Sequence, residues 1–225
     1  HGVIRDEQGR KMSKSLGNSP DPVDLMNKYG ADAIRFSLLF NTSQGQDIHF
    51  SEKLLEMGSS FSNKVWNASK FVLSNLEDFD YSTSVMDLEF KLEDRWILSK
   101  LQSSSKKINE AMENYELDTA AKTAYEFFRG DFCDWYVEIA KTRVYGNEGI
   151  DKITAQWILR HVLDNGLRIL HPFMPYITEE IWQKVKLGDE TIMLVEFPEE
   201  DKSLVDTNSE KEFDYLREVI TAIRN

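Results

Sequence analysis

The chain has little cysteine, and Cys133 is the single thiol among its 225 residues. One cysteine cannot form an internal disulfide, and it cannot build a cysteine-based zinc site. Histidines are also few, and none has the H-E-x-x-H spacing or another metal-binding pattern. They are His1, His49, His161 and His171. We therefore expect that this chain binds no metal ion.

Long hydrophobic runs are missing as well. None approaches the roughly 20 apolar residues that a membrane helix needs, so we expect no membrane partner. A hydrophobic content of 41% and a charged content of 29% are typical of a soluble globular protein. The first residues, His1 to Arg5, contain neither an initiator methionine nor a signal peptide. We expect the chain to be a piece of a longer protein.

Basic residues are outnumbered, with 27 lysines and arginines against 39 aspartates and glutamates and a formal net charge of -12. Because phosphate contacts need lysine and arginine, this balance argues against indiscriminate nucleic-acid binding. A local basic face remains compatible with it, since much of the acidic excess gathers near the end of the chain. These acidic residues are Glu196, Glu199, Glu200, Asp201, Asp206, Glu210, Glu212 and Asp214. Any RNA site should be small and dependent on shape.

What the chain does contain is a lysine–serine run near its start. The run consists of Lys11, Met12, Ser13, Lys14 and Ser15. Two ammonium groups three residues apart, interleaved with two hydroxyls, suit a loop that grips a polyphosphate. Flanking glycines at positions 9 and 17 give its backbone hinge freedom. From these residues alone, the alternative is a solvated surface loop.

The run continues as K-M-S-K-S-L-G-N, which resembles in full the second signature of class I aminoacyl-tRNA synthetases. Asp21-Pro22 and then Y-G-A-D-A-I-R-F at residues 29–36 follow in the order found in those enzymes. The resemblance implies that Lys14, supported by Lys11, is catalytic and contacts the phosphates of ATP. The stabilisation of departing pyrophosphate would be electrostatic and would involve no proton transfer. Met12, Ser13 and Ser15 would complete the ATP-binding loop, with Mg²⁺ accompanying ATP in the whole enzyme.

Residues 1–50 are predicted to form a small α/β segment that carries this loop. Val3–Arg5 and Asp47–Phe50 are typical of short strands. Asp21 can cap a helix that has a proline at its first position, and Ala31–Phe40 is predicted to form a second helix. The family resemblance implies that this segment contacts the stem of a tRNA.

Residues 51–187 are predicted to form a helical bundle, and residues 188–225 an acidic C-terminal extension that ends in a helix from about Ser209. Apolar residues recur at three- and four-residue steps, which is typical of helices with one buried face. On the first two long helices the predicted buried residues include Leu54, Gly58, Phe61, Val65, Ala68, Val72, Ile97, Leu101, Ser104, Ile108, Ala111 and Tyr115. The candidate residues that open the helices are Ser51, Asp118, Asp151 and Thr178. Ile192–Phe197 is predicted to be extended. The fold class is therefore mainly α, a bundle preceded by a small α/β segment.

Three segments of the bundle resemble the anticodon-binding domain of class I synthetases for branched aliphatic amino acids. They are N-K-V-W-N-A from Asn63, F-C-D-W-Y-V-E from Phe132 and H-P-F-M-P-Y-I-T-E-E-I-W from His171. Gly45–Ile48 and the form of the His-Pro segment most resemble the valine branch of the family. The resemblance implies a ligase that joins valine to its tRNA with ATP, this part reading the anticodon arm. The isoleucine branch is one alternative, and a non-catalytic helical interaction module is another.

The family's first ATP signature, a His-x-Gly-His run, is missing from this sequence. The residues of the amino-acid pocket and the editing domain have no counterpart here either. We therefore expect this piece alone to be inactive, within a parent enzyme that works as a monomer. The free Cys133, taken together with the family resemblance, predicts a reducing cytoplasm.

For tRNA contacts, the candidates lie beside the apolar stripe of the first long helix. They are Lys53, Lys64, Asn67 and Phe71. The lysines could meet phosphates while Phe71 stacks an unpaired anticodon base, a contact worth about 1–3 kcal/mol per base. The alternative is that Phe71 packs between helices and that the lysines are ordinary solvated charges. Lys100 and Lys107 form a second, weaker candidate face.

Other conspicuous residues are interpreted as structural. Asp134 and Glu138 lie four residues apart on an aromatic-rich helix. We expect Glu138 to pair with Lys141, or with Arg129 or Arg143 nearby. His171 is expected to cap backbone carbonyls at a helix end. Four tryptophans are expected in the core, namely Trp66, Trp96, Trp157 and Trp182.

Overall fold

The computed structural model describes residues 2–43, 45–185 and 191–224 of the chain. In chain order, its elements are β1 (Ile4–Arg5), α1 (Pro22–Tyr29), α2 (Ala31–Phe40), β2 (Ile48–His49), α3 (Glu52–Ser74), α4 (Leu92–Glu113), α5 (Leu117–Tyr125), a π-helical segment (Glu126–Tyr136), α6 (Val137–Val144), α7 (Ile150–Leu170), α8 (Pro175–Val185) and α9 (Thr207–Arg224). Short 3-10 turns lie at Lys14–Leu16, Val85–Asp87, Ile192–Leu194 and Lys202–Leu204. The predicted class, mainly α after a small α/β segment, is confirmed.

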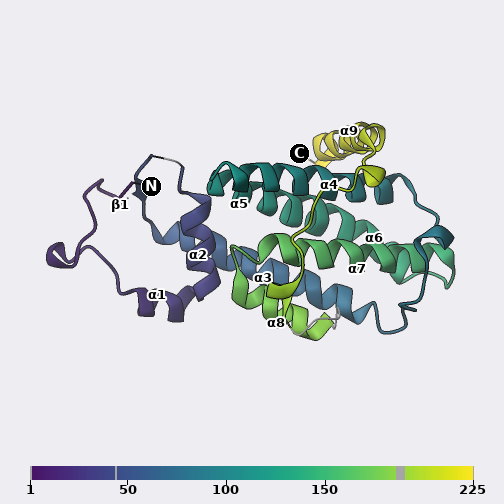
Figure 1. Ribbon diagram of the computed structural model, residues 1–225, viewed down its shortest axis with the longest axis horizontal. Helices are drawn as coiled ribbons and strands as arrows, with labels where there is room; N and C mark the ends of the chain where they lie inside the picture. The colour runs from purple at the N-terminus through teal and green to yellow at the C-terminus, as the bar shows by residue number, and fades with distance from the viewer. Residues whose placement is uncertain (1, 44, 186–190, 225) are drawn as a thin grey trace.

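The N-terminal segment has the predicted strands and helix cap. β1 and β2 pair in parallel, with Ile4 opposite Ile48. Asp21 caps α1 by accepting a hydrogen bond of 2.7 Å from the backbone N–H of Val23. Pro22 takes the first helical position, where no backbone N–H is needed. Figure 1 shows this segment, in purple, at one end of the long axis of the molecule.

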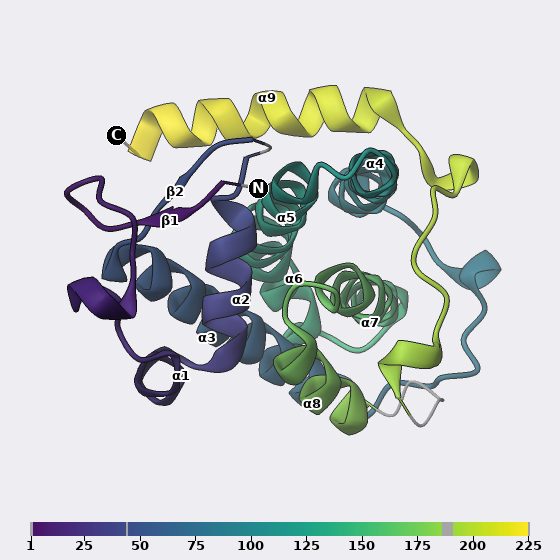
Figure 2. The same cartoon turned by 60° about the vertical axis from the view of Figure 1, so that its left-hand side comes forward.

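The bundle consists of α3, α4, α7, α8 and the helical stretch that runs from α5 through the π-helical segment into α6 (Figures 1 and 2). α7 contacts α3, α4, α5, α6 and α8, which is why its sequence is apolar on most sides. Within residues 2–43, 45–185 and 191–224, no helix has the length and apolarity needed to cross a membrane.

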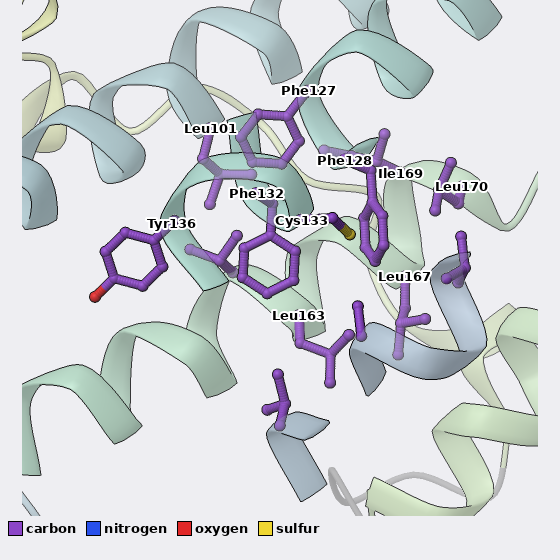
Figure 3. Packing of buried hydrophobic residues seen from close by; sticks show 14 of the residues in the cluster. Leu101, Phe127, Phe128, Phe132, Cys133, Tyr136, Leu163, Leu167, Ile169 and Leu170 are labelled. Atoms are coloured by element: carbon purple, nitrogen blue, oxygen red, sulfur yellow. The ribbon is translucent and has the colours of Figure 1, made fainter. Parts of the chain in front are cut away.

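The core centres on aromatic rings of the π-helical segment (Figure 3). Phe127, Phe128 and Phe132 are each at most 1% exposed. Phe128 meets Phe132 edge to face with ring centroids 5.4 Å apart, and Figure 3 shows these rings beside Leu163 and Leu167 of α7. Burying one phenylalanine of this kind contributes roughly 1.5–3 kcal/mol to folding. The bundle is therefore held mainly by apolar packing.

A charged pair is buried next to this apolar core. The guanidinium of Arg143 on α6 donates to Asp94 Oδ1 of α4 at 2.6 Å, and the two side chains are 5% and 0% exposed. The hydroxyl of Tyr136 donates to the same oxygen at 2.8 Å. Asp151 of α7 brings a second carboxylate to 2.7 Å from Arg143 Nε. The pair thus joins α4, α6 and α7, and removing one partner would leave a buried charge uncompensated.

α2 attaches the N-terminal segment to the bundle. A Cβ on Gly58 of α3 would lie 2.5 Å from the carbonyl oxygen of Ala33, so the two helices can approach this closely only because residue 58 is a glycine. Phe36 of α2 is fully buried in the shared core. Asp32 accepts a hydrogen bond of 2.6 Å from the backbone N–H of Ile177 and so stabilises the N-terminal end of α8.

The C-terminal part packs on the outer face of α4, where Figure 2 shows α9 lying along the molecule. Asn109 donates to a backbone carbonyl of the incoming segment at 2.8 Å, and Gln102 accepts one of its backbone N–H groups at 2.9 Å. Arg217 of α9 lies between the rings of Trp96 and Trp135, 5.2 and 5.1 Å from their centroids. α9 is thus fixed by a cation between two aromatic rings.

The C-terminal elements differ slightly from the prediction. α9 begins at Thr207, two residues before the predicted start. The segment predicted to be extended opens with a 3-10 turn at Ile192–Leu194. The predicted boundary between residues 187 and 188 lies outside the described residues.

Three predicted helix starts were wrong by a few residues. α5 has Glu116 at its cap, and Asp118 instead lies in its first turn. α7 has Gly149 at its cap, and Asp151 lies in its first turn. α8 begins at Pro175, so Thr178 is buried inside it. Acidic and hydroxyl residues favour both the cap and the first turn, because the first backbone N–H groups are unpaired and the helix dipole is positive there.

Three predicted buried positions were also wrong. Leu54 and Ser104 are only partly buried, whereas their neighbours Leu55 and Ser105 are buried. Tyr115 lies beyond α4, is 81% exposed and has a positive φ of 60°. A helical period locates a stripe, but it does not decide which of two adjacent residues reaches the core.

The predictions for the four tryptophans are confirmed in part, and the prediction for His171 was wrong. Trp96 and Trp182 are buried, at 0% and 2% exposed, while Trp66 and Trp157 are partly buried and pack against the core. His171 ends α7, but its Nδ1 lies 2.7 Å from the hydroxyl of Thr178 and does not cap a backbone carbonyl. The ring contacts α8 because the chain turns back sharply after α7.

Candidate phosphate-binding loop and nucleic-acid interface

The lysine–serine loop, residues 11–18, is half strand and half turn. Lys11 forms an antiparallel bridge with Arg5, and the backbone N–H of Met12 donates to the carbonyl of Ile4 at 2.9 Å. Ser13 then caps the 3-10 turn, because its hydroxyl accepts from the backbone N–H of Leu16 at 3.3 Å. The first two residues are therefore attached to β1, and the rest project from it.

The tip of the loop presents its polar groups to solvent. Lys11 and Lys14 are exposed, and no carboxylate of the described residues lies within ion-pair distance of either ammonium. The hydroxyls of Ser13 and Ser15 lie 3.2 Å apart beside them. Gly17 closes the turn with φ 65°, a conformation that favours glycine. The loop thus presents two ammonium groups that have no carboxylate partner among the described residues, with two hydroxyls beside them, which suits a polyphosphate ligand.

Asp6 and Asn18 close the base of the loop, and the sequence analysis missed both of them. Asn18 Nδ2 donates to Asp6 Oδ2 at 2.9 Å, while Asn18 Oδ1 accepts from the backbone N–H of Ser13 at 2.9 Å. Hydrogen bonds from Asn18 and Arg10 hold the pKa of Asp6 well below its usual range. Asn18 belongs to the K-M-S-K-S-L-G-N run, but nothing in that local pattern identifies an acceptor twelve residues earlier.

A groove of about 600 Å³ runs beside the loop, between β1 and α2. Its walls are mainly apolar, and the loop contributes Lys11 and Met12 to the lining. The other lining residues are Gly2, Val3, Ile4, Ser19, Leu38, Leu39, Thr42 and Ile48. Met12 therefore contributes an apolar contact to this groove, and its place in the ATP-binding loop stays a prediction.

Three of the four candidate tRNA-binding residues lie together. Lys64, Asn67 and Phe71 line a concavity of about 190 Å³ between α3 and the stretch formed by the π-helical segment and α6. We call this concavity the α3–α6 pocket. Lys53 is exposed but lies about three helical turns closer to the start of α3, outside the pocket.

The α3–α6 pocket combines an aromatic ring with cations from two helices. Lys141 of α6 places its ammonium 5.9 Å from the centroid of the half-buried Phe71. Tyr145, which is 70% exposed, meets Phe71 edge to face at 6.2 Å. The sequence analysis did not assign Lys141 and Tyr145 to this surface, because they are more than 65 residues from Phe71 along the chain. A weak signal was their spacing of four residues on one helix.

Lys64 is paired within the pocket. Its ammonium lies 2.8 Å from Asp134 Oδ1, and the two side chains are 40% and 46% exposed. The hydrogen bond to Asp134 raises the pKa of Lys64. Cys133 forms part of the floor, and burial raises the pKa of its thiol to about 12. The thiol is therefore protonated at neutral pH and contributes an uncharged, apolar surface.

The remaining candidates behave mainly as structural groups. The ammonium of Lys100 lies 2.7 Å from Asp214 of α9, so α9 covers the second candidate face at this point, while Lys107 is exposed. Glu138 pairs with Lys141 at 2.7 Å, as predicted. Among the described residues, no group of three or more His, Cys, Asp or Glu side chains is placed to hold a metal ion.

Two families of known proteins match the chain. Residues 1–51 match the family described as tRNA synthetases class I (I, L, M and V). Residues 94–225 match the family described as anticodon-binding domain of tRNA ligase. The first match contains the lysine–serine loop, and the second contains the α6 side of the α3–α6 pocket.

Curated relatives match along the whole chain. The valine--tRNA ligase of Fusobacterium nucleatum subsp. nucleatum is 57% identical over 229 residues, which cover 100% of this chain and 26% of that protein. The valine--tRNA ligases of Bacillus cereus and Thermotoga maritima are each 44% identical over 100% of the chain, and 26% and 25% of those proteins are covered. The chain thus spans about a quarter of the length of these relatives.

A solved structure has a similar fold. The crystal structure of the ternary complex of Agrobacterium radiobacter K84 agnB2 LeuRS-tRNA-LeuAMS aligns with a TM-score of 0.70 and 25% identity, covering 91% of this chain and 24% of that one. The anticodon-binding family covers more than half of this chain, from residue 94 to residue 225, and the class I family covers residues 1–51. The chain therefore belongs to the family described as anticodon-binding domain of tRNA ligase.

Proposed function

We propose that the chain is part of a valine--tRNA ligase that uses ATP to join valine to its tRNA. In this proposal residues 11–18 belong to the ATP site, and the α3–α6 pocket binds the anticodon arm. The observation that carries the proposal is the whole-chain identity of 44–57% to valine--tRNA ligases. The ammonium groups of the loop, unpaired among the described residues, suit the phosphates of ATP, and the aromatic ring of the α3–α6 pocket suits a base of the anticodon arm.

At the ATP site, the loop would act through charge. When the carboxylate of valine attacks the α-phosphorus of ATP, pyrophosphate leaves and its negative charge increases. Lys14, on the exposed tip, can approach the leaving oxygens, while Lys11 remains on the strand beside the groove. A charged contact of this kind typically contributes about 3 kcal/mol in the transition state. Mg²⁺ would enter with the phosphates of ATP.

At the α3–α6 pocket, a base and its phosphate could bind together. An unpaired base stacking on Phe71 would bring its phosphate near Lys141 and Lys64. The Lys64–Asp134 pair is partly exposed to solvent and contributes at most about 1 kcal/mol, so a phosphate can replace the carboxylate at little cost. Asn67 offers an amide that can hydrogen-bond a base edge.

The acidic body of the protein would make this binding selective. The net charge of -12 repels RNA that does not fit, so affinity should depend on a few lysines and one stacking ring. Lys53 would contact the same arm about three turns along α3. The parent enzyme is proposed to act as a monomer in the cytoplasm.

The direct test is fluorescence-anisotropy binding of this chain to valine tRNA and to the same tRNA with its anticodon bases exchanged. We expect the exchange to weaken binding by about ten-fold or more, which is the worth of one stacked and hydrogen-bonded base. Isoleucine tRNA serves as the competitor that separates the two branches of the family. Equal binding to all three RNAs would contradict anticodon reading by this bundle.

Variants then locate the site. Phe71→Ala should weaken binding to valine tRNA by about ten-fold or more, and Lys64→Ala should reduce the salt dependence by roughly 0.7 in the logarithmic slope. Asp134→Asn should strengthen binding, because it releases Lys64 for phosphate. Lys70→Ala is the matched control, since Lys70 is an exposed lysine of α3 outside the pocket. An equal loss for Lys70→Ala and Lys64→Ala would mean that general charge, and not this pocket, binds the RNA.

A further inference from the structure

The lysine–serine loop contains two mechanically different parts. Its base, from Lys11 to Ser13, is attached to β1 by backbone hydrogen bonds and to Asn18 by hydrogen bonds with the side-chain amide of that residue. Its tip, from Lys14 to Gly17, is exposed and consists of one 3-10 turn. A single turn of this kind has few internal bonds and should move on its own.

Asn18 is the residue that separates the two parts. Its side chain makes hydrogen bonds to the backbone N–H of Ser13 at 2.9 Å, to the carbonyl of Lys11 at 3.3 Å and to Asp6 Oδ2 at 2.9 Å. One amide thus uses its oxygen and both of its N–H bonds to join the two ends of the loop. The loop between them therefore starts and finishes at fixed points.

Asp6 in turn fixes Asn18. Its carboxylate accepts from the backbone N–H groups of Gln8 and Arg10 at 3.0 and 2.8 Å and pairs with the Arg10 guanidinium at 2.7 Å. Its charge is therefore compensated before any phosphate arrives. This matters because an uncompensated carboxylate so close to the loop would repel a polyphosphate.

We propose that Asp6 and Asn18 form a clasp that positions the lysine–serine loop for ATP, holding Lys11 and Ser13 in place while Lys14 remains free to move onto the phosphates. The inference rests on the function proposed above. Asp6 and Asn18 are positioning residues in this proposal, since Asn18 acts through Ser13 and Lys11 and Asp6 acts through Asn18. Holding the base reduces the conformational freedom that must be lost when the tip closes.

The first measurement is made on this chain alone and needs no activity. Backbone ¹⁵N relaxation should give order parameters near 0.85 for residues 11–13 and lower values for residues 14–17. Asn18→Ala should lower the order parameter of Ser13 to roughly 0.6 or less. Ser19→Ala, a change at the exposed neighbouring residue, should leave it unchanged. An ordered Ser13 in the Asn18→Ala variant would overturn the clasp.

A charge exchange tests whether the two side chains act as a pair. Asn18→Asp alone places two carboxylates face to face and should loosen Ser13. The double variant Asp6→Asn with Asn18→Asp restores one donor and one acceptor between the two positions, and we expect it to recover most of the order. Recovery no better than in Asn18→Asp alone would contradict direct pairing. Circular-dichroism melting should be the same for all these variants, because the bundle core is untouched.

The second measurement uses the complete ligase and valine-dependent ATP–pyrophosphate exchange. Asn18→Ala should lower kcat roughly ten-fold or more with a smaller change in the KM for ATP, since it removes positioning and no phosphate contact. The double exchange variant should recover part of kcat. A loosened Ser13 with an unchanged kcat would overturn the positioning role.

Lys14→Ala in the same assay distinguishes a failure of the positioning role from a failure of the proposed ATP function. Loss of exchange in Lys14→Ala together with normal exchange in Asn18→Ala overturns the positioning role alone. Normal exchange in Lys14→Ala overturns the proposed ATP function, and the positioning role with it, while the relaxation data still decide whether the clasp exists.

Discussion

The lysine–serine loop and the aromatic core are held in shape by different interactions. In the loop, Lys14 is exposed, and the shape is set by hydrogen bonds to a few side chains such as Asn18. In the core, Phe128 and Phe132 are fully buried, and the shape is set by packing among several helices. Side chains of the loop can therefore be substituted without loss of the fold, whereas even small substitutions in the core should lower the free energy of unfolding.

The largest effect on stability is expected at the buried charged pair. Arg143→Met should lower the free energy of unfolding by about 3–5 kcal/mol, because it leaves the carboxylate of Asp94 buried without its cation. Urea unfolding followed by circular dichroism measures the change. Lys141→Met removes an exposed pair from the same helix and should cost at most about 0.5 kcal/mol. Equal losses for the two variants would show that burial does not decide the worth of these pairs.

In the loop, a substitution should affect the reaction rate of the complete ligase and leave the stability of this chain unchanged. Lys14→Ala should lower the rate of aminoacyl-adenylate formation in the complete ligase by about 10²-fold, since it removes a cation from the leaving pyrophosphate. The melting temperature of this chain should not change, because Lys14 is exposed and makes no ion pair with a described residue. Lys107→Ala, which changes an exposed lysine of α4, should affect neither quantity. A drop in melting temperature for Lys14→Ala would break the contrast between loop and core.

The junction between the two regions should respond in an intermediate way. Gly58→Ala should lower the free energy of unfolding by roughly 1–3 kcal/mol, because the added Cβ would lie 2.5 Å from the Ala33 carbonyl oxygen and would push α2 from α3. Gly130→Ala is the matched control, since no atom beyond its chain neighbours and the adjacent backbone of its own helix lies within 4 Å of the Cβ added there. Denaturant unfolding compares the two, and a neutral Gly58→Ala would mean that α2 can shift without cost.

A pH effect is expected at His161, whose ring stacks on Trp157 with centroids 4.8 Å apart. Burial lowers the pKa of His161 from 6.5 to about 4, with the nearby Arg168 and Arg160 adding to the effect. The unfolded chain therefore binds a proton before the folded chain does, so this contribution is complete above pH 6.5 and is lost as pH falls toward about 4. Because the ring is only partly buried, the loss should be about 2 kcal/mol.

The measurement is the free energy of unfolding at several pH values for the wild type and for His161→Gln. The glutamine variant should lose less stability across this interval, because it carries no titrating ring. Identical pH slopes for the two proteins would show that His161 titrates normally in the folded state.

Much of the fold could be predicted from local patterns. Asp21 and Pro22 marked the start of α1, and the limits of α2 were predicted to the residue, since capping and helix propensity act over a few neighbours. Asp118 and Asp151 misled the prediction because an acidic residue suits both the cap and the first turn. The π-helical winding was not foreseen, since the same aromatic residues fit an ordinary helix.

In the candidate site, too, residues within one short run could be predicted, whereas contacts between different helices could not. The lysines and serines of the loop could be recognised because their chemistry lies within five consecutive residues. The roles of Lys64, Phe71 and their neighbours stay predictions that binding experiments must test. The pairing of Lys64 with Asp134, and the position of Lys141 over Phe71, could not be read from the chain, because these partners come from different helices.

The sequence by itself determined a helical bundle behind a small α/β segment, a lysine–serine loop and the resemblance to class I synthetases, while the binding of polyphosphate by that loop stays a prediction. Each of these depends on periodicity or on short runs, in which the interacting groups are neighbours in the chain. Only the tertiary structure decided that Asp6 closes the loop through Asn18, that Arg143 neutralises Asp94, and that α9 covers Lys100. Those contacts depend on how helices pack, and packing is settled by the whole core at once rather than by any local pattern.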